Sequence, residues 1–265
     1  MTSTDDILAL AARAAPSGQA EADLARFAEA VTRGADSDAV RALRALRPVS
    51  GGAAALPDSA AWRAWLMAAA ATAAPRETAA QAETAAAPRE TAAAPRETTA
   101  RFVVCAAASA LDGRALAGPA DDRLAAVAAG TRAAELVEAE LAESVLAESV
   151  LAGAVLAGAG LAGSGLAETG WSVTTVSAVI GAGLAAGMML RLEPARLRHA
   201  LGVCATQAAG LRSAAATRAG PLQAGKAAFN AVEAAQLVGL GFTSSREPLD
   251  GRRGLFALFR PPGES

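Results

Sequence analysis

Residues 170–259 read GWSVTTVSAVIGAGLAAGMMLRLEPARLRHALGVCATQAAGLRSAAATRAGPLQAGKAAFNAVEAAQLVGLGFTSSREPLDGRRGLFALF. Alanine is frequent in this stretch and throughout the chain of 265 residues, whereas aromatic residues make up only 3% of the chain. Alanine has the highest helix propensity, and strands favour the β-branched and aromatic residues that are scarce here. The sequence therefore predicts an all-α fold.

The chain upstream of this stretch carries further helical patterns. Residues 5–47 predict three short amphipathic helices, with a break at Pro16-Ser17-Gly18 and a cap at Asp36-Ser37-Asp38. Asp58-Ser59 marks the start of a fourth helix, in which Trp62, Trp65 and Leu66 share one face. We expect these tryptophans to pack in the core.

Two repetitive segments interrupt the pattern. Residues 74–98 contain the sequence APRET three times, and their prolines predict short helical turns or a linker. Residues 141–170 form six pentads that begin with Leu-Ala; the first half predicts a helix continuous with the preceding segment, and the Gly-rich second half a loop. We interpret residues 1–265 as a single helical domain that carries both segments.

The charge pattern excludes several classes of partner. A net charge of -2 without a basic cluster argues against nucleic acid. Residues 149–167 and 169–190 lack charge and are long enough to span a bilayer, but they lack basic flanks, so we expect a buried helix hairpin and no membrane span. Cys105 and Cys204 lack the spacing of metal ligands, so we expect reduced thiols. The N-terminal segment is acidic where a secretory signal carries positive charge. Both observations favour the cytoplasm.

Short motifs in residues 170–259 occur in an order that resembles the helical domain of the MmgE/PrpD family, which contains 2-methylcitrate dehydratases and cis-aconitate decarboxylases. The matching positions are Gly170, Trp171, Thr174, His199-Ala200-Leu201-Gly202, Gln207, Gly210-Leu211, Pro221-Leu222, Ala224-Gly225 and Gly241-Phe242-Thr243. The resemblance implies a helical domain that dimerises. It also implies a smaller α+β lid domain, for which we find no counterpart before Ser265.

The resemblance also shows which family positions have changed. Ser172 and Val173 replace the His and Pro of the Gly-aromatic-His-Pro-Thr element. Gly220 replaces a Lys, Gln223 the His that follows it, and Lys226 an Arg. The Asp-rich turn of the family has no counterpart either, because the APRET segment takes its place. We therefore do not expect methylcitrate dehydration or aconitate decarboxylation.

The polar residues that remain define a candidate site without an evident general base. We predict catalytic roles for Ser172, Thr174 and Gln223, and substrate contacts for Trp171, Thr175, Gln207, Arg212, Arg218 and Lys226. Lys226 is expected to begin a helix after Gly225, and either to reach the site or to lie on the surface. His199, the only histidine, is interpreted as a helix-packing residue. No motif for a metal, nucleotide or other cofactor is present.

Two functions fit this pattern. The first is a repurposed enzyme of specialised metabolism, lyase-, isomerase- or cyclase-like, which binds a largely apolar small molecule and promotes isomerisation, cyclisation, dehydration or elimination. The second is a non-catalytic pseudoenzyme that stabilises or regulates a full-length partner, because base, cations and lid are lost together. Fold alone does not choose between them.

Overall fold

The computed structural model describes residues 2–46, 59–83, 96–112, 121–158 and 170–259. Within these ranges the chain is helical, and the only β-type pairing is an isolated bridge between Trp171 and Leu211. The elements are α1 (Thr4–Ala12), α2 (Gly18–Arg33), α3 (Asp38–Ala45), α4 (Ala60–Glu83), α5 (Arg96–Asp112), α6 (Asp121–Gly158), α7 (Val173–Met189), α8 (Pro194–Thr206), α9 (Arg212–Ala215), α10 (Ala219–Gly239) and the 3-10 helix η2 (Phe256–Leu258). The predicted all-α fold is confirmed.

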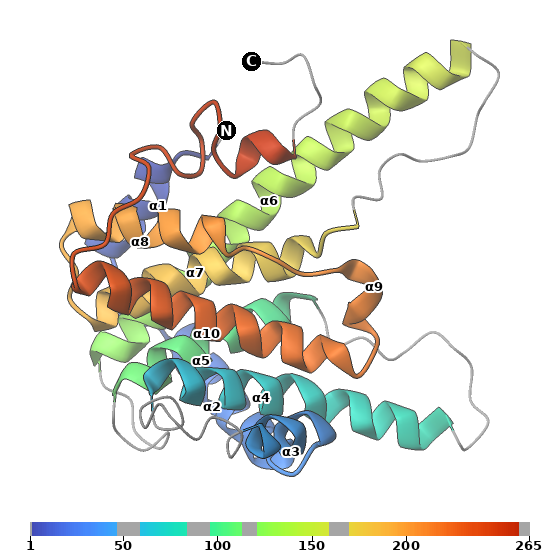
Figure 1. Ribbon diagram of the computed structural model, residues 1–265, viewed down its shortest axis with the longest axis vertical. Helices are drawn as coiled ribbons and strands as arrows, with labels where there is room; N and C mark the ends of the chain where they lie inside the picture. The colour runs from blue at the N-terminus through green and yellow to red at the C-terminus, as the bar shows by residue number, and fades with distance from the viewer. Residues whose placement is uncertain (1, 47–58, 84–95, 113–120, 159–169, 260–265) are drawn as a thin grey trace.

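Helix α7 forms the centre of the bundle (Figure 1). Every residue from Thr174 to Gly187 is buried, and α5, α6, α8 and α10 all pack against this helix. A helix that is apolar on all sides requires such complete enclosure, and within the described ranges no helix is long and apolar enough to cross a membrane. The buried-helix interpretation therefore holds for Thr174–Gly187, whereas the side chains predicted to pair with this helix, in residues 149–167, lie outside the described residues.

Small residues set the spacing between α6 and α7. A methyl group added at Gly181 would lie 2.3 Å from the carbonyl oxygen of Gly130 and 2.8 Å from the Cβ atom of Ala134. No side chain larger than hydrogen fits at this contact without moving one helix. Glycine at position 181 is therefore required by the close approach of the two helices.

Serine caps fix the starts of α2, α3 and α4, and those at Ser37 and Ser59 lie where the sequence predicted caps. Ser17 caps α2, Ser37 caps α3, and Ser59 accepts a hydrogen bond from the Trp62 amide at 3.1 Å. Each hydroxyl satisfies an amide at the first turn that has no partner within the helix. The predicted caps at Ser37 and Ser59 are therefore confirmed, and the predicted break at Pro16-Ser17-Gly18 contains a third cap.

Three helix limits differ from the sequence-based expectation. The prediction that a helix begins at Lys226 is wrong, because α10 begins at Ala219; Pro221 lies in its first turn, where an amide hydrogen is not needed. α4 continues through Pro75 to Glu83, further than predicted, and α6 continues to Gly158 and extends beyond its neighbours (Figure 1). Residues 84–95 and 159–169 of the repeats lie outside the described residues.

Candidate functional site

Three of the predicted site residues meet where α7 and α10 begin. Ser172 caps α7, and its Oγ atom lies 2.8 Å from Thr175 Oγ1. Gln223, on α10, donates from Nε2 to Thr175 Oγ1 at 3.1 Å. We call these side chains the Ser172–Thr175–Gln223 network. The network joins the two sequence elements in which Ser172 and Gln223 replace histidines of the family pattern.

The backbone around residue 210 holds this network in place. The Ser172 amide donates to the Gly210 carbonyl at 2.9 Å, and the Leu211 amide donates to Gln223 Oε1 at 2.9 Å. Gly210 has a φ of +142°, and a Cβ atom there would lie 2.9 Å from Thr175 Cβ and 3.0 Å from Gln223 Nε2. Glycine at 210 is therefore required by both backbone conformation and space.

Thr174 faces a different helix from Thr175. Its Oγ1 atom donates to Glu138 Oε1 on α6 at 3.0 Å, and Glu138 is half-buried. Glu138 was missed by the sequence analysis, because it lies in a run of glutamates on a helix whose neighbours the sequence does not specify. Its carboxylate is a titratable group directly hydrogen-bonded to a predicted site residue, and it can act as an acid or a base.

Two of the predicted cationic groups make other contacts. Arg218 forms an ion pair with Asp38 on α3; the Arg218 side chain is largely exposed and that of Asp38 about half-exposed. Lys226 Nζ lies 3.7 Å from the ring centroid of Phe229 and 5.1 Å from that of Trp65. Partial burial lowers the pKa of Lys226, while the nearby Glu233 carboxylate opposes this change. The cation–π contacts place Lys226 against the α4–α10 seam.

The remaining substrate-contact candidates lie at the surface or act through their backbone. Trp171 and Leu211 are 45% and 56% exposed and are joined by the isolated bridge, so they form an apolar edge beside the network. The Arg212 amide donates to the Gly170 carbonyl at 3.0 Å. Gln207 contributes its main-chain carbonyl to the Asn230 side chain at 3.1 Å.

The histidine and the cysteines have structural surroundings. His199 Nδ1 accepts a hydrogen bond from the Ser244 amide at 3.1 Å, and the His199 carbonyl accepts from Ser244 Oγ. This contact joins α8 to the C-terminal segment. Cys105 and Cys204 are free and buried, and desolvation raises the pKa of Cys204 to about 12 and that of Cys105 further. Neither thiol forms a thiolate at neutral pH.

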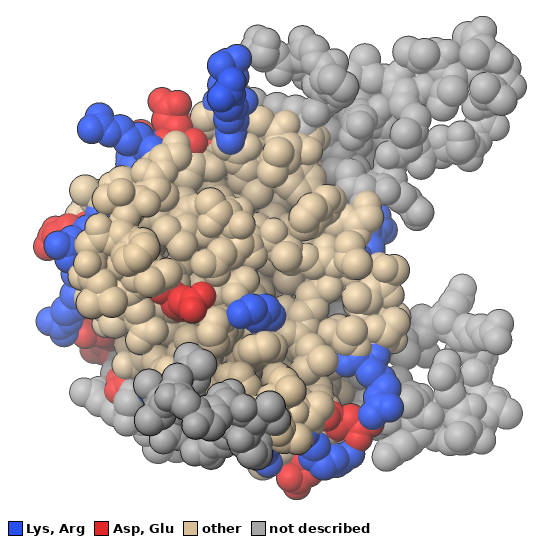
Figure 2. Space-filling model, viewed as in Figure 1, with Lys and Arg blue, Asp and Glu red and all other residues tan. Residues whose placement is uncertain are grey.

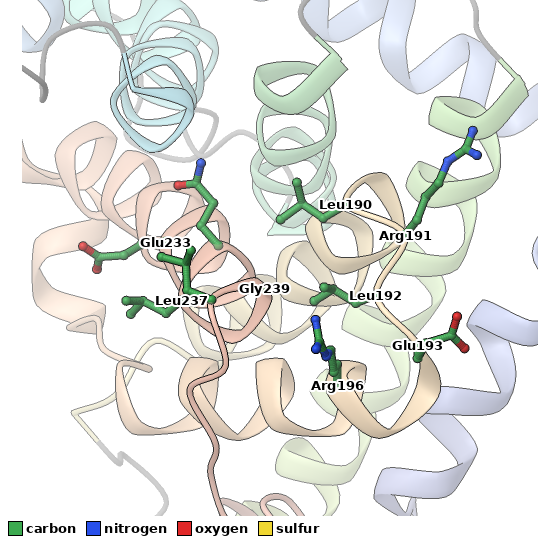
Figure 3. A pocket seen from close by; sticks show the side chains of 10 residues that line it. Leu190, Arg191, Leu192, Glu193, Arg196, Glu233, Leu237 and Gly239 are labelled. Atoms are coloured by element: carbon green, nitrogen blue, oxygen red, sulfur yellow. The ribbon is translucent and has the colours of Figure 1, made fainter.

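Two cavities within the described ranges lie away from the predicted site residues. The larger, of about 800 Å³, lies where α10 ends beside the α7–α8 turn (Figure 3). The smaller, of about 230 Å³, lies beside Asp23 and Arg101, whose side chains form a 2.7 Å ion pair. Among the described residues, no cluster of His, Cys, Asp and Glu has the arrangement needed to hold a metal ion.

The arrangement offers neutral hydrogen-bonding groups, one carboxylate and an apolar edge. The surface over α8 and α10 carries few charged side chains, most of which lie at the periphery (Figure 2).

A family model described as MmgE/PrpD N-terminal domain matches residues 22–264. A search of the curated proteins finds no match.

Proposed function

The chain belongs to the MmgE/PrpD family, and from this membership we propose that it binds a largely apolar small molecule beside the first turn of α7 and promotes its isomerisation, cyclisation, dehydration or elimination. Each of these reactions requires that a proton be moved to or from the bound molecule. The proposal therefore depends on a group that can exchange a proton at this position.

The hydrogen bond between Thr174 and Glu138 is the observation that carries the proposal. The 3.0 Å contact holds a half-buried carboxylate at the first turn of α7. As a base, Glu138 would take a proton from a carbon of the ligand; as an acid, it would return the proton to a different carbon or to a leaving group. Thr174 would act as a positioning residue, because its hydroxyl fixes one carboxylate oxygen.

The surroundings favour an apolar ligand over a polycarboxylate. Trp171 and Leu211 are exposed apolar side chains, and the Ser172–Thr175–Gln223 network supplies uncharged polar groups. Recognition of a polycarboxylate requires several cations, but Arg218 is paired with Asp38 and Lys226 packs on two aromatic rings. A neutral molecule with one or two polar groups fits this chemistry better.

The metabolic role, the compartment, the oligomeric state and the domain organisation are inferred from the sequence and from the family. We place the activity in specialised metabolism and in the cytoplasm, and we expect a homodimer and a single domain over residues 1–265. The lost family cations argue for a changed substrate, and the buried reduced thiols suit a reducing compartment. The dimer is an inference from the family.

The test is a comparison of metabolite profiles. The wild-type chain and the Glu138→Gln and Thr174→Val variants are expressed in the same host, and their small-molecule extracts are compared by mass spectrometry. We expect a product that depends on the wild-type chain, is lost in Glu138→Gln and is reduced in Thr174→Val. Glu29→Gln, which changes an exposed glutamate on α2, is the matched control and should retain the product. An unchanged profile in Glu138→Gln would refute the proposal.

One observation favours the second function, a non-catalytic subunit that stabilises or regulates a full-length family member. Ser172, Thr175 and Gln223 hydrogen-bond to one another and to the Leu211 amide, so much of their capacity is already used within the fold. Under this alternative, Glu138→Gln leaves all metabolites unchanged. Co-expression with a full-length family member from the same genome then yields a stable complex on size-exclusion chromatography.

A further inference from the structure

We infer that the larger cavity, at the end of α10, is a binding site for a small amphipathic carboxylate, with Arg196 holding the carboxylate and leucines covering the apolar chain. This site is separate from the Ser172–Thr175–Gln223 network, and the inference does not depend on the proposed function. The cavity is lined by Leu190, Arg191, Leu192, Glu193, Arg196, Glu233, Gln236, Leu237, Gly239 and Leu240. We refer to it as the α10-end groove.

Secondary structure fixes both walls of the α10-end groove. On one side, α7 ends and the chain turns through Arg191, whose φ is +54°, before α8 begins. The Leu192 amide donates to the Gly187 carbonyl at 2.9 Å, which holds this turn against α7. On the other side lies the last turn of α10, where the Phe242 amide donates to the Leu237 carbonyl at 3.1 Å. The groove is therefore built from hydrogen-bonded elements.

Arg196 is the cation in this groove for which the described residues supply no counter-ion. Its guanidinium makes no ion pair or hydrogen bond to another side chain in the described part of the chain. Figure 3 shows it beside Leu192, in the space between α10 and the α7–α8 turn. Arg191 differs, because it points away and pairs with Asp122 at 3.0 Å.

The carboxylates at the groove do not neutralise Arg196. Glu193 and Glu233 line the cavity, but Figure 3 shows both side chains directed away from the space between the walls, and neither lies within ion-pair distance of Arg196. A guanidinium forms paired hydrogen bonds with a carboxylate. An anionic ligand would therefore supply the partner that the described residues do not.

Leucines supply the apolar part of the site. Leu190 and Leu192 come from the α7–α8 turn, and Leu237 and Leu240 come from the end of α10. Leu240 is 82% exposed and the neighbouring Phe242 is 59% exposed, so apolar surface continues from the groove onto its rim. Burying these side chains under an alkyl chain removes apolar surface from water.

The dimensions favour a small molecule over a protein segment. A volume of about 800 Å³ lies within the range of sites that enclose small ligands. One free cation beside several leucines matches a molecule with one carboxylate and one apolar chain. Octanoate combines these two features and serves as the probe.

The experiment measures octanoate binding to the full chain by isothermal titration calorimetry. Octanol tests the apolar chain without the charge, acetate tests the charge without the chain, and octylamine reverses the charge. We expect octanoate to bind at least tenfold more tightly than each of the others. Arg196→Gln should weaken octanoate binding at least tenfold, whereas Arg198→Gln, on the same helix but outside the groove, should retain it.

Two further variants test the apolar wall of the groove and its independence from the proposed catalytic site. Leu237→Asn should weaken octanoate and octanol alike, and circular dichroism with thermal unfolding establishes that each variant folds. Glu138→Gln should leave octanoate binding unchanged, which separates this site from the proposed catalytic one. Equal affinities for octanoate and octanol, equal affinities of Arg196→Gln and wild type, or no octanoate binding at all would overturn the inference.

Discussion

Thr174 Oγ1 donates a hydrogen bond to Glu138 Oε1 at 3.0 Å, which ties the first turn of the central helix α7 to α6. Thr174 is 9% exposed, so its hydroxyl has little access to water as an alternative partner. Hydrogen bonds of this kind, with a charged acceptor, contribute about 1.5–3 kcal/mol.

The first prediction concerns this contact. Thr174→Val keeps the shape of the side chain but removes the donor, so we expect the free energy of unfolding in urea to fall by about 1–2 kcal/mol. Thr174→Ser retains a hydroxyl and should lose less. No loss in Thr174→Val, or a loss no larger than that in Thr174→Ser, would contradict the stabilising role of this hydrogen bond.

The second prediction concerns Gln223, whose side chain bridges Thr175 Oγ1 and the Leu211 amide. Gln223→Ala leaves both groups without this partner, so we expect faster amide hydrogen exchange at Leu211 and a loss of about 1–2 kcal/mol in stability. Gln207→Ala is the matched control, because Gln207 bonds to Asn230 through its main-chain carbonyl. Equal exchange at Leu211 in both variants would contradict the bridging role.

Much of the fold could be predicted from local sequence patterns. The caps at Ser37 and Ser59 act over a few residues, so the sequence alone identified these helix starts. The burial of Thr174–Gly187 followed from the lack of charge in this part of the sequence. The start of α10 was placed too late because Gly220 and Gly225 weaken a helix locally, whereas packing of α10 against α4 and α7 offsets this cost.

The site was harder to predict than the fold. Convergence of residues 172 and 223 was expected from motif order, because both elements resemble family motifs. Glu138 could not be found in this way, since its contact with Thr174 depends on how α6 is rotated against α7. The Arg218–Asp38 pair joins residues far apart in sequence, and the ring contacts of Lys226 depend on the α4–α10 packing.

The third prediction concerns the contact between α6 and α7. Gly181→Ala places a methyl group where the Gly130 carbonyl oxygen would lie 2.3 Å away, so the helices must separate. We expect the free energy of unfolding to fall by about 1–3 kcal/mol, with a lower Tm by calorimetry. Gly239→Ala, at the end of α10 with open space around the added carbon, is the control and should not lower Tm. A Gly181→Ala protein as stable as wild type would show that the helices tolerate separation.

The fourth prediction concerns the pH dependence contributed by Lys226, the only lysine in the sequence. Partial burial against Trp65 and Phe229 disfavours the ammonium and lowers its pKa in the folded protein below the ordinary value of 10.5. The unfolded chain therefore keeps the proton at pH values where the folded protein has released it. Stability from this group rises with pH between the two values and is lost as the pH falls through the folded pKa.

A single lysine makes this prediction directly measurable. In protein labelled with ¹³C-lysine, the one ε-carbon signal reports the titration of Lys226, and its midpoint should lie below 10.5. Phe229→Leu replaces one aromatic face with an aliphatic side chain while keeping the site apolar; because the ring attracts the cation, the midpoint should fall further. A wild-type midpoint at or above 10.5 would mean that the cation–π contacts and the Glu233 carboxylate outweigh desolvation, which reverses the sign of this contribution to stability.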